Sequence, residues 1–553
     1  MEFTLDAYAA RSCPVKTHNA FHPGLSLPAG DEGLREVFHG GVAFSAEVLD
    51  ALLAGFGGSV LDGRELTHLP AAEQEAVAMR ALGAGVQVLI GPLLPRDGVG
   101  HRSGRPDLLL RAPEGGYHPV EIKFHRVTDQ RSAASQLTWS ALSDPANRQV
   151  LPGYRFRNTW RLNDLLQLAH YQRMLLRLGY AASEPLAAVV GNDELPGLGR
   201  VLSWVDLDAP LLPPSPRALA DAAPEPVSAL QRYDTEHAFR VEVAEVASAL
   251  EPGDPPALLP IANRECGWCQ WWDVCRPQLD DDDLSLRISK SPLDVHEIRV
   301  LRDLGVATVA ELAATDLAGL LPEYLPRVTH RIGAEERLRL AWRRSVLMQR
   351  GVDFDRVTEG TIDVPRATVE IDLDIETSVD DRVYLWGFLV SDSRDGSCYY
   401  RHFGAFETLD DEAERNLAAA AMGWLRDLVD GVDALVYHYS DYEVVRLHRL
   451  ADGSRTLTWA EEWAQRHFVD LFTYIRTHFF GTQGLGLKVV ASRAAGFRWR
   501  DSDPGGLNSQ SWFHEAVTGE TPEIRAAARQ RVLEYNEDDV RATWHVRRWL
   551  RTL

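Results

Sequence analysis

The sequence predicts a multidomain α/β protein, and three observations lead to this prediction. The chain has 553 residues, whereas a single hydrophobic core stops growing at roughly 250–300 residues. Residues 104–124 and 369–377 contain alternating apolar and polar side chains, the pattern typical of β-strands. Residues 521–550 have the periodicity of one long helix, with Pro522 in its first turn. Strands and helices therefore both contribute, in more than one domain.

Net charge and hydropathy restrict the kinds of partner and the location that we expect for this protein. Taken alone, the formal net charge of −22 argues against a nucleic-acid partner, since phosphate binding depends on clustered Lys and Arg. Acidic clusters that hold divalent metals would lower the same sum while basic residues gather elsewhere. No apolar run reaches the ~20 residues of a membrane span, and residues 1–16 lack the features of a signal peptide. We therefore expect a cytoplasmic protein with no membrane partner.

Two composition changes predict the domain boundaries. The acid-rich run at 278–285 is predicted to be a linker because its like charges repel one another. The helical pattern of 291–316, interrupted by Gly305, is similar to helix-hairpin-helix modules that bind the nucleic-acid backbone, and a plain helical spacer is the alternative. A second boundary precedes the β-patterned segment at 369. The expected domains are residues 1–284, a helical connector at 285–360, and residues 361–553.

An acidic and a basic side chain share one face of a predicted strand in the first domain. Because strand side chains alternate, Glu121 and Lys123 lie opposite the apolar residues of that strand. Turn residues at 113–116 predict a hairpin, which would bring Asp107 beside Glu121. Two carboxylates can hold a hard cation such as Mg²⁺, and the lysine can orient water or phosphate for hydrolysis. The same spacing also occurs by chance without an active site.

A helical motif follows this hairpin. Gln167 and Tyr171 are four residues apart and share a face of the predicted helix. Together, "GRPD", "EIK" and "QLAHY" resemble the RecB-type branch of the PD-(D/E)xK nucleases. The resemblance implies a restriction-endonuclease-like mixed sheet with helices and a metal held by Asp107 and Glu121. The catalytic residues it implies are Asp107, Glu121, Lys123, Gln167 and Tyr171. The candidates for a further ligand usual in this family are His68, Glu73, Glu75 and His101.

Three of the five cysteines, Cys266, Cys269 and Cys275, fall within "CGWCQWWDVC". In a reducing compartment such clustering favours a metal site over disulfides. Some RecB-like nucleases carry a [4Fe–4S] cluster with one cysteine before the nuclease motifs and three after them, and Cys13 supplies the first. The resemblance thus implies a structural [4Fe–4S] cluster held by these four residues. Zinc is one alternative and unliganded buried thiols are another, while Cys398 lies outside the pattern.

The alternation in "VEIDLDIET" places four carboxylates on one face of a strand. They belong to Glu370, Asp372, Asp374 and Glu376. Like charges this close are unfavourable unless a cation or solvent compensates them, and a divalent metal would do so. A solvated edge strand is the alternative. Near the C-terminal end, Tyr535 and Asp539 share a face of the long helix.

A strand Asp-x-Glu with a late helical Tyr-x-x-x-Asp resembles the DEDD exonucleases of the ribonuclease H-like fold, tyrosine subtype. The resemblance implies two metal ions, Mg²⁺ or Mn²⁺, a tyrosine that positions water, and 3′→5′ removal of nucleotides. "ALVYHYSDYEVVRLHRL" resembles the second motif of that family, with Glu443 at the position of its Asp, while Asp441 and Asp470 are alternatives. The implied metal ligands are Asp374, Glu376, Glu443 and Asp539, and Tyr535 completes the catalytic set.

Two metal-hydrolysis motifs and a cysteine cluster indicate one substrate class, phosphodiesters. We expect a metal-dependent DNA nuclease with two sites, acting on single strands or duplex ends in DNA repair or end processing. RNA and a partner helicase remain open. The alternative is a nucleic-acid-binding scaffold with one or both sites inactive. A further stretch, "RQVLPGYRFRNTWR", interleaves arginines with aromatic residues and is either a nucleic-acid contact or a solvated loop.

Overall fold

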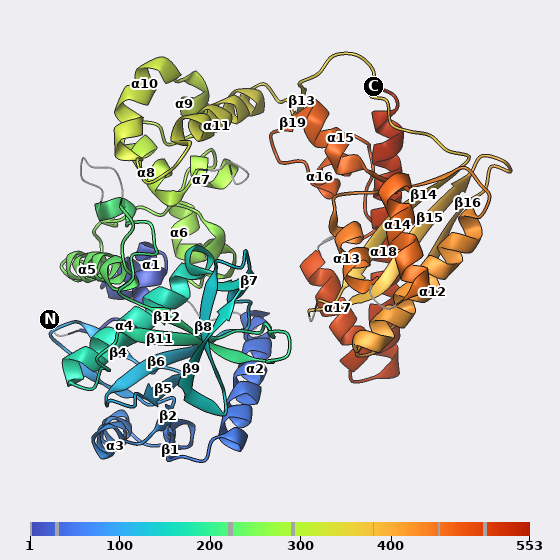
Figure 1. The fold of residues 1–553 in the computed structure, drawn as a ribbon. Coiled ribbons are helices and arrows are strands. Elements are labelled where there is room, and N and C mark those ends of the chain that lie inside the picture. Colours follow the sequence, from blue (N-terminus) through green and yellow to red (C-terminus); the bar gives the residue numbers. More distant parts are fainter. Residues whose placement is uncertain are drawn as a thin grey trace. The chain divides into compact units, whose positions relative to one another are not determined.

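The structure is a computed structural model, and its contacts divide the chain into two compact units (Figure 1). The first comprises residues 1–287 and 292–339, and the second residues 340–553 with 288–291. None of the described helices combines the length and the apolarity that a bilayer span requires. The described residues are 3–27, 33–218, 225–288, 293–379, 381–451, 454–501 and 506–553.

An eight-stranded mixed sheet forms the centre of the first unit (Figure 1). In spatial order its strands are β1 (Val60–Asp62), β2 (Val88–Ile90), β5 (Leu108–Arg111), β6 (Tyr117–Ile122), β11 (Leu186–Val190), β12 (Val201–Asp206), β8 (Gln136–Ala141) and β9 (Asp144–Pro152). The pairs β1–β2 and β6–β11 are parallel, and the other neighbours are antiparallel. In the β5–β6 hairpin Leu108 is opposite Val120, so the residues just before β5 lie beside the end of β6.

Helices cover both faces of this sheet. Helix α2 (Gly33–Gly55) packs on the face that carries Leu108, whereas α4 (Leu162–Leu178) packs on the face that carries Leu109. Helix α5 (Ala229–Ser248) adds to the α4 side. A strand covered on both faces needs apolar residues in sequence, which explains the leucine run of β5. The face under α4 is the one toward which Glu121 and Lys123 point, by the alternation of the strand.

Short elements complete the first unit. They are α1 (Pro14–Phe21), α3 (Ala71–Ala84), β3 (Leu94–Asp97), β4 (Arg102–Gly104), β7 (Thr128–Gln130), β10 (Tyr154–Phe156), α6 (Trp272–Cys275) and α7 (Leu284–Arg287). The helices that follow are α8 (Val295–Asp303), α9 (Val309–Ala314), α10 (Leu317–Tyr324) and α11 (Ala334–Gln349). Gly305, between α8 and α9, has φ +82°, a left-handed conformation that glycine adopts without strain.

The acidic run at 280–283 differs from the linker that its charge pattern predicts. Asp283 is 4% exposed, and its Oδ2 accepts a hydrogen bond from Arg302 at 2.7 Å. Asp282 Oδ2 accepts one from the backbone N–H of Ala310 in the first turn of α9, at 2.8 Å. Positive partners and helix N–H groups thus hold charges that would otherwise repel one another.

The second unit is a three-layer α/β fold around a five-stranded sheet (Figure 1). Its strands in spatial order are β16 (Cys398–Gly404), β15 (Val383–Asp392), β14 (Val369–Thr377), β17 (Ala434–His438) and β18 (Phe468–Asp470). β14 is antiparallel to β15 and parallel to β17. Because β14 is the central strand, the solvated edge strand considered for this segment is excluded.

The two faces of β14 meet different helices. Its apolar residues pack against α12 (Asp411–Val429), α13 (Tyr442–Leu450) and α14 (Arg455–His467). On the opposite face the long helix α18 (Pro522–Leu550) lies along the strand (Figure 1). The acidic residues of β14 therefore face α18. The remaining elements are β13 (Phe354–Arg356), α15 (Leu471–His478), β19 (Phe479–Gly481), α16 (Leu487–Arg493) and α17 (Gly506–Thr518).

Candidate functional site

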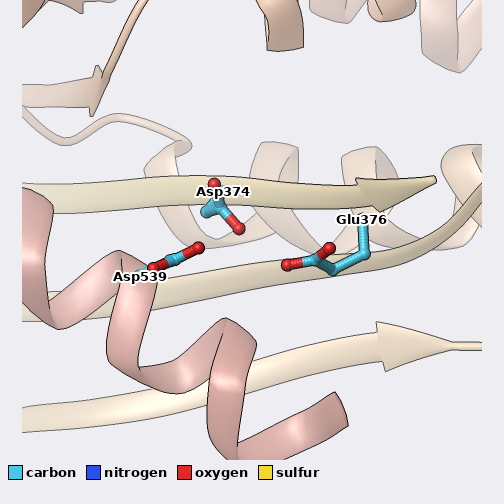
Figure 2. A group of neighbouring side chains, drawn as sticks. All are labelled: Asp374, Glu376 and Asp539. Carbon is cyan, nitrogen blue, oxygen red and sulfur yellow. The ribbon is translucent and has the colours of Figure 1, made fainter. Parts of the chain in front are cut away.

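Three carboxylates converge where β14 and α18 lie side by side (Figure 2). Asp374 and Glu376 project from the strand and Asp539 from the helix, and one oxygen of each lies within 4.8 Å of the others. Glu376 and Asp539 are buried, whereas Asp374 is partly exposed. Oxygen donors at this spacing form the ligand set that Mg²⁺ and Mn²⁺ prefer.

Burial raises the pKa of all three carboxyl groups. The charge of Asp539 is the next cause for Asp374 and for Glu376, since like charges disfavour ionisation. The pKa of Asp539 is raised by burial too, although Lys488 opposes the shift. Without further positive charge the group retains protons near neutral pH. A divalent cation would favour the ionised carboxylates and reverse these shifts.

One oxygen of each acid is held by an uncharged donor. The three pairs are Asn536 Nδ2 to Asp374 Oδ2 (2.8 Å), Ser509 Oγ to Glu376 Oε2 (2.5 Å) and Trp499 Nε1 to Asp539 Oδ1 (2.6 Å). Uncharged donors fix the direction of a carboxylate but do not neutralise it. The arrangement therefore orients three negative groups around a common point and leaves their charge to be balanced by a cation.

Gly387 makes room for one of these donors. Gly387 pairs with Asp374 across β14 and β15, and a Cβ at this position would lie 1.7 Å from Asn536 Oδ1. That same oxygen accepts a hydrogen bond from the Tyr400 hydroxyl at 2.7 Å. The close approach of Asn536 to the sheet thus requires glycine.

Tyr535 lies one helical turn before Asp539, and its hydroxyl accepts a hydrogen bond from Lys488 Nζ at 2.7 Å. Burial and the three nearby acids raise the pKa of Tyr535, so the phenol keeps its proton. The Lys488 ammonium lies 4.7 Å from the centre of the Tyr535 ring and lowers the pKa of Asp539. Lys488, on α16, was not identified from the sequence motifs. The rarity of lysine could have drawn attention to Lys488, because only four of the 58 basic residues of the chain are lysines.

Of the three acids proposed for the second motif, Glu443 has the clearest electrostatic effect on the triad. Glu443 is buried, and its charge raises the pKa of Asp374. Its Oε2 lies 3.5 Å from His438 Nδ1. Asp441 is exposed, and Asp470 accepts hydrogen bonds from Ser440 N and Phe472 N, both at 2.9 Å, which makes it a helix cap. Glu443 is not part of the group within 4.8 Å.

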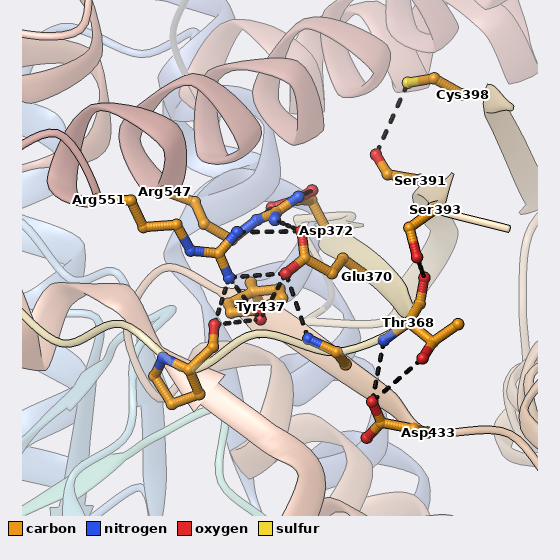
Figure 3. Close-up of polar contacts among 12 residues, drawn as sticks. Thr368, Glu370, Asp372, Ser391, Ser393, Cys398, Asp433, Tyr437, Arg547 and Arg551 are labelled. Carbon is orange, nitrogen blue, oxygen red and sulfur yellow. Dashed lines mark hydrogen bonds and ion pairs between the residues drawn. The ribbon is translucent and has the colours of Figure 1, made fainter. Parts of the chain in front are cut away.

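The other half of the acidic face of β14 is neutralised by arginines (Figure 3). Arg547 donates to both oxygens of Asp372, at 3.0 and 2.7 Å, and also contacts Glu370. Arg551 donates to Glu370 Oε1 at 2.7 Å. Both arginines belong to or follow the last turns of α18. Of the four carboxylates on this face, two therefore have arginine partners and two face Asp539.

A polar cavity of about 510 Å³ lies near these arginines rather than at the triad. Its lining includes Arg366, Thr368, Trp544 and Arg548. Along β14 Glu370 precedes Asp374 by four residues, which corresponds to roughly 13 Å of strand. The cavity is thus separate from the candidate metal site, whose acids are packed closely by their donors.

The first unit brings together the motif residues of the hairpin and α4. Asp107 Oδ2 accepts from the backbone N–H of Ile122 at 2.8 Å. Lys123 Nζ lies 2.7 Å from Glu121 Oε2 and donates to Gln167 Oε1 at 3.0 Å. Glu121 Oε1 has no hydrogen-bond partner among the described residues. Burial, followed by the charge of Asp107, raises the pKa of Glu121 to about 8.

The remaining candidates of the first unit have structural contacts. The Tyr171 hydroxyl donates to the backbone oxygen of Arg105 at 3.0 Å, and burial raises its pKa. His101 Nδ1 lies 3.0 Å from the backbone oxygen of Phe3. His68 and Glu73 are exposed and Glu75 is half-buried. No hydrogen bond between described residues links these last four candidates to Glu121.

Four cysteines line one small pocket of the first unit. They are Cys13, Cys266, Cys269 and Cys275. Asn19 Nδ2 lies 3.6 Å from Cys275 Sγ, and the backbone N–H of Asn263 lies 3.4 Å from Cys266 Sγ. Burial raises the pKa of Cys275 to about 11 and also raises that of Cys13. The described cysteines supply no group of three sulfurs within 4.8 Å of one another.

Comparison with known families identifies part of the chain. Residues 372–551 match the family described as the RNase_H superfamily. The second unit contains a ribonuclease H-like domain. This domain carries the Asp374, Glu376 and Asp539 triad on its central strand and its last helix, an arrangement consistent with a nuclease. No curated protein and no solved structure matches the chain.

Proposed function

We propose that this protein is a metal-dependent nuclease that hydrolyses phosphodiester bonds at two sites, one in each unit. The observation that carries the proposal is the convergence of Asp374, Glu376 and Asp539 inside the ribonuclease H-like domain. Carboxylates that are held by neutral donors and have no arginine partner among the described residues are suited to divalent cations. DNA, as single strands or duplex ends, is the proposed substrate, in repair or end processing.

At the second site the chain's own residues have distinct roles. Asp374, Glu376 and Asp539, with Glu443 as a further donor, would hold Mg²⁺ or Mn²⁺, which supplies a hydroxide nucleophile and stabilises phosphate charge. Tyr535, kept protonated, can donate a hydrogen bond to or orient the attacking water, and Lys488 fixes its hydroxyl. The resemblance of the Tyr535 and Asp539 motif to the tyrosine subtype supports 3′→5′ removal of nucleotides as the proposed polarity.

At the first site, Asp107 and Glu121 would hold the metal and Lys123 would orient water or the scissile phosphate. The bond from Lys123 to Gln167 supports this assignment, because it fixes the ammonium beside Glu121. The unpaired Glu121 oxygen and its raised pKa also favour a ligand role, since a cation would satisfy that oxygen. We assign residues 1–284 to a RecB-like domain and 285–360 to its helical connector.

The cysteine pocket is proposed to hold a structural [4Fe–4S] cluster. The four thiols lie in one pocket, and nearby N–H groups can donate to their sulfurs, which fits such a group. A zinc ion with Zn–S bonds of ~2.3 Å needs sulfurs about 3.8 Å apart. No three described cysteine sulfurs lie within 4.8 Å of one another, and zinc is the alternative occupant of the pocket. The cluster would join Cys13 to residues 266–275 and so close the first unit.

Digestion of end-labelled DNA tests the two-site proposal. Single- and double-stranded substrates are incubated with Mg²⁺ or Mn²⁺ and wild type, Asp107→Asn, Asp374→Asn or the double variant. We expect Asp374→Asn to abolish stepwise loss from the 3′ end, Asp107→Asn to abolish the remaining cleavage, and the double variant to be inactive. Digestion by the double variant at the wild-type rate would refute the proposal.

A nucleic-acid-binding scaffold is the second candidate. The observation that favours it is Glu443, which contacts His438 and lies outside the close group of acids. If the second site lacks activity, Glu443→Asp should restore 3′→5′ digestion without altering DNA affinity. If neither the wild type nor Glu443→Asp cleaves DNA although both bind it, the result would favour the scaffold.

A further inference from the structure

An arginine-rich surface adjoins the first candidate site. We define the arginine shelf as Arg126, Arg131, Arg155, Arg157, Trp160 and Arg161. The shelf is built by two separate chain segments, because β7 pairs antiparallel with β10 and places Arg155 opposite Asp129. The 3-10 helix Asn158–Arg161 then leads directly into α4.

Trp160 is the exposed aromatic residue of the shelf. Its side chain is 74% exposed, although burying an indole normally contributes favourably to folding. The Arg157 guanidinium lies 5.7 Å from the centre of the Trp160 ring. An exposed indole beside guanidinium groups is the arrangement on which unpaired bases stack, because every base offers a π-face.

The shelf is positive on a strongly acidic chain. The net charge of the protein is −22, yet the shelf contains five arginines. Asp129 pairs with Arg131 at 2.9 Å and with Arg157 at 3.1 Å. Arg126 and Arg155 are exposed and form no ion pair among the residues that the structure describes. Their charge is complementary to a phosphate backbone.

The shelf is fixed to the candidate catalytic residues. Arg126 follows Lys123 by three residues, so their Cα atoms are at most about 11 Å apart. Arg161 Nε donates to the backbone oxygen of Arg126 at 2.6 Å. His125 Nε2 lies 2.8 Å from Asp164 Oδ2, one turn before Gln167 on α4. A strand bound on the shelf would therefore reach Lys123 within a few nucleotides.

We propose that the arginine shelf binds single-stranded nucleic acid, with a base stacked on Trp160, and delivers the strand to Glu121 and Lys123. This inference rests on the proposed function of the first site and names its substrate class. Inside a duplex the faces of the bases are covered by their neighbours, so Trp160 can stack only on an unpaired base or at the end of a duplex. The shelf thus selects single strands or frayed ends.

Binding of oligonucleotides to the full chain is measured by the fluorescence anisotropy of the labelled probe. A metal chelator is present, so that no hydrolysis occurs. The probes are a labelled oligothymidylate of about 15 nucleotides and a blunt hairpin duplex. We expect Trp160→Ala to weaken oligothymidylate binding by about fivefold or more and Trp160→Phe to preserve most of it. Arg126→Ala and Arg155→Ala should each lower the slope of log affinity against log salt by about 0.7. Arg177→Ala, which removes a positive charge from the other end of α4, is the matched control.

Cross-linking distinguishes the shelf from the ribonuclease H-like domain, which would also bind single strands. An oligonucleotide carrying 5-iodouracil is irradiated with the protein, and the attached peptide is identified by mass spectrometry. We expect attachment to the tryptic peptide Asn158–Arg161. Cross-links confined to residues 340–553, with Trp160→Ala and wild type binding equally, would overturn the inference and leave the proposed nuclease function intact. Trp160-dependent binding without any cleavage that requires Asp107 would instead refute the proposed function of the first site.

Discussion

The ammonium of Lys488 lies 2.7 Å from the hydroxyl of Tyr535, one helical turn from the Asp539 carboxylate. Lysine is rare in this chain, with four occurrences among 58 basic residues. Lys123 contacts Glu121 in the first site, and Lys16 contacts Glu265 beside the cysteine pocket. The ammonium of lysine is a compact point charge with rotatable donors, whereas the guanidinium of arginine is larger and planar. The three described lysines thus lie at the three candidate sites.

Substitution of Lys488 tests this relationship. Lys488→Met should lower 3′→5′ digestion by about 10- to 100-fold, because the Tyr535 hydroxyl loses the donor that positions it. Lys488→Arg should lower it too, because the larger planar guanidinium cannot place a donor at the same point. Initial rates on 3′-labelled single strands measure the effect. Arg493→Ala, on the same helix and paired with partly exposed Asp353, should retain the wild-type rate. Equal rates for Lys488→Arg and wild type would contradict a need for the compact ammonium.

The buried Glu121 predicts how stability depends on pH. Its pKa is about 8 in the folded protein and ordinarily 4.5, so the folded state binds more protons between these values. Stability in the absence of metal should therefore fall as pH rises from about 5 to 8. Glu121→Gln should flatten this part of the Tm profile, and Mg²⁺ should restore stability at the upper end. The exposed Glu194→Gln serves as the control, and a wild-type slope in Glu121→Gln would contradict the assignment.

The cysteine pocket predicts a specific loss of metal. Protein purified without oxygen should contain iron and sulfide and absorb broadly at about 400 nm. Cys266→Ser should lose the colour and much of the soluble yield, since the cluster joins distant parts of the first unit. Cys398→Ser, which removes an exposed thiol of the second unit, should keep both. Colourless wild-type protein with stoichiometric zinc would contradict the prediction.

The Arg547–Asp372 pair predicts a large effect on folding. Both side chains are at most 1% exposed, so Arg547→Met leaves a buried carboxylate without its partner. We expect a loss of about 3–5 kcal/mol in the free energy of unfolding, measured by urea titration. Adding Asp372→Leu should recover part of this loss. The neighbouring exposed Arg548→Met should change stability by no more than about 0.5 kcal/mol. A small effect of Arg547→Met would show that the pair is dispensable.

Gly387 predicts a defect in metal binding. Gly387→Ala should displace Asn536 and so release Asp374, which lowers Mn²⁺ affinity measured by calorimetry by roughly 10- to 100-fold. Gly423 of α12 offers the matched control, because a Cβ there meets its nearest atom, Thr456 Cγ2, at 3.9 Å. Gly423→Ala should bind Mn²⁺ as the wild type does. Unchanged affinity in Gly387→Ala would refute the role of Asn536.

Sequence patterns predicted the site best where a single strand or helix determines which residues share a face. The alternation of β14 correctly placed its four acids on one side, and Asp374 and Glu376 meet Asp539 as the ribonuclease H-like resemblance implied. Strand periodicity could not reveal that Arg547 neutralises the other pair, because that contact depends on which helix packs on the strand. Helical spacing offered a hint, since Arg547 follows Asp539 by eight residues and shares its face.

Contacts between distant segments were the hardest to foresee. Nothing in the local pattern around Trp499 or Ser509 indicates that they hold Asp539 and Glu376, since each acts through one hydrogen bond from a loop or helix. Charge repulsion alone predicts a linker for the acidic run at 280–283, but the helix N–H groups that compensate these charges come from a distant segment. Asp107, Glu121 and Lys123 are close in sequence, and a hairpin is sufficient to bring them together.

The triad draws two members from a strand and the third from a helix far downstream, which affects the protein during its synthesis. Roughly 160 residues separate Glu376 from Asp539, and a ribosome needs on the order of ten seconds to add them. During that interval the nascent polypeptide carries two of the three acids, so the candidate metal site is incomplete. The full set of three acids forms only when helix α18 docks on β14.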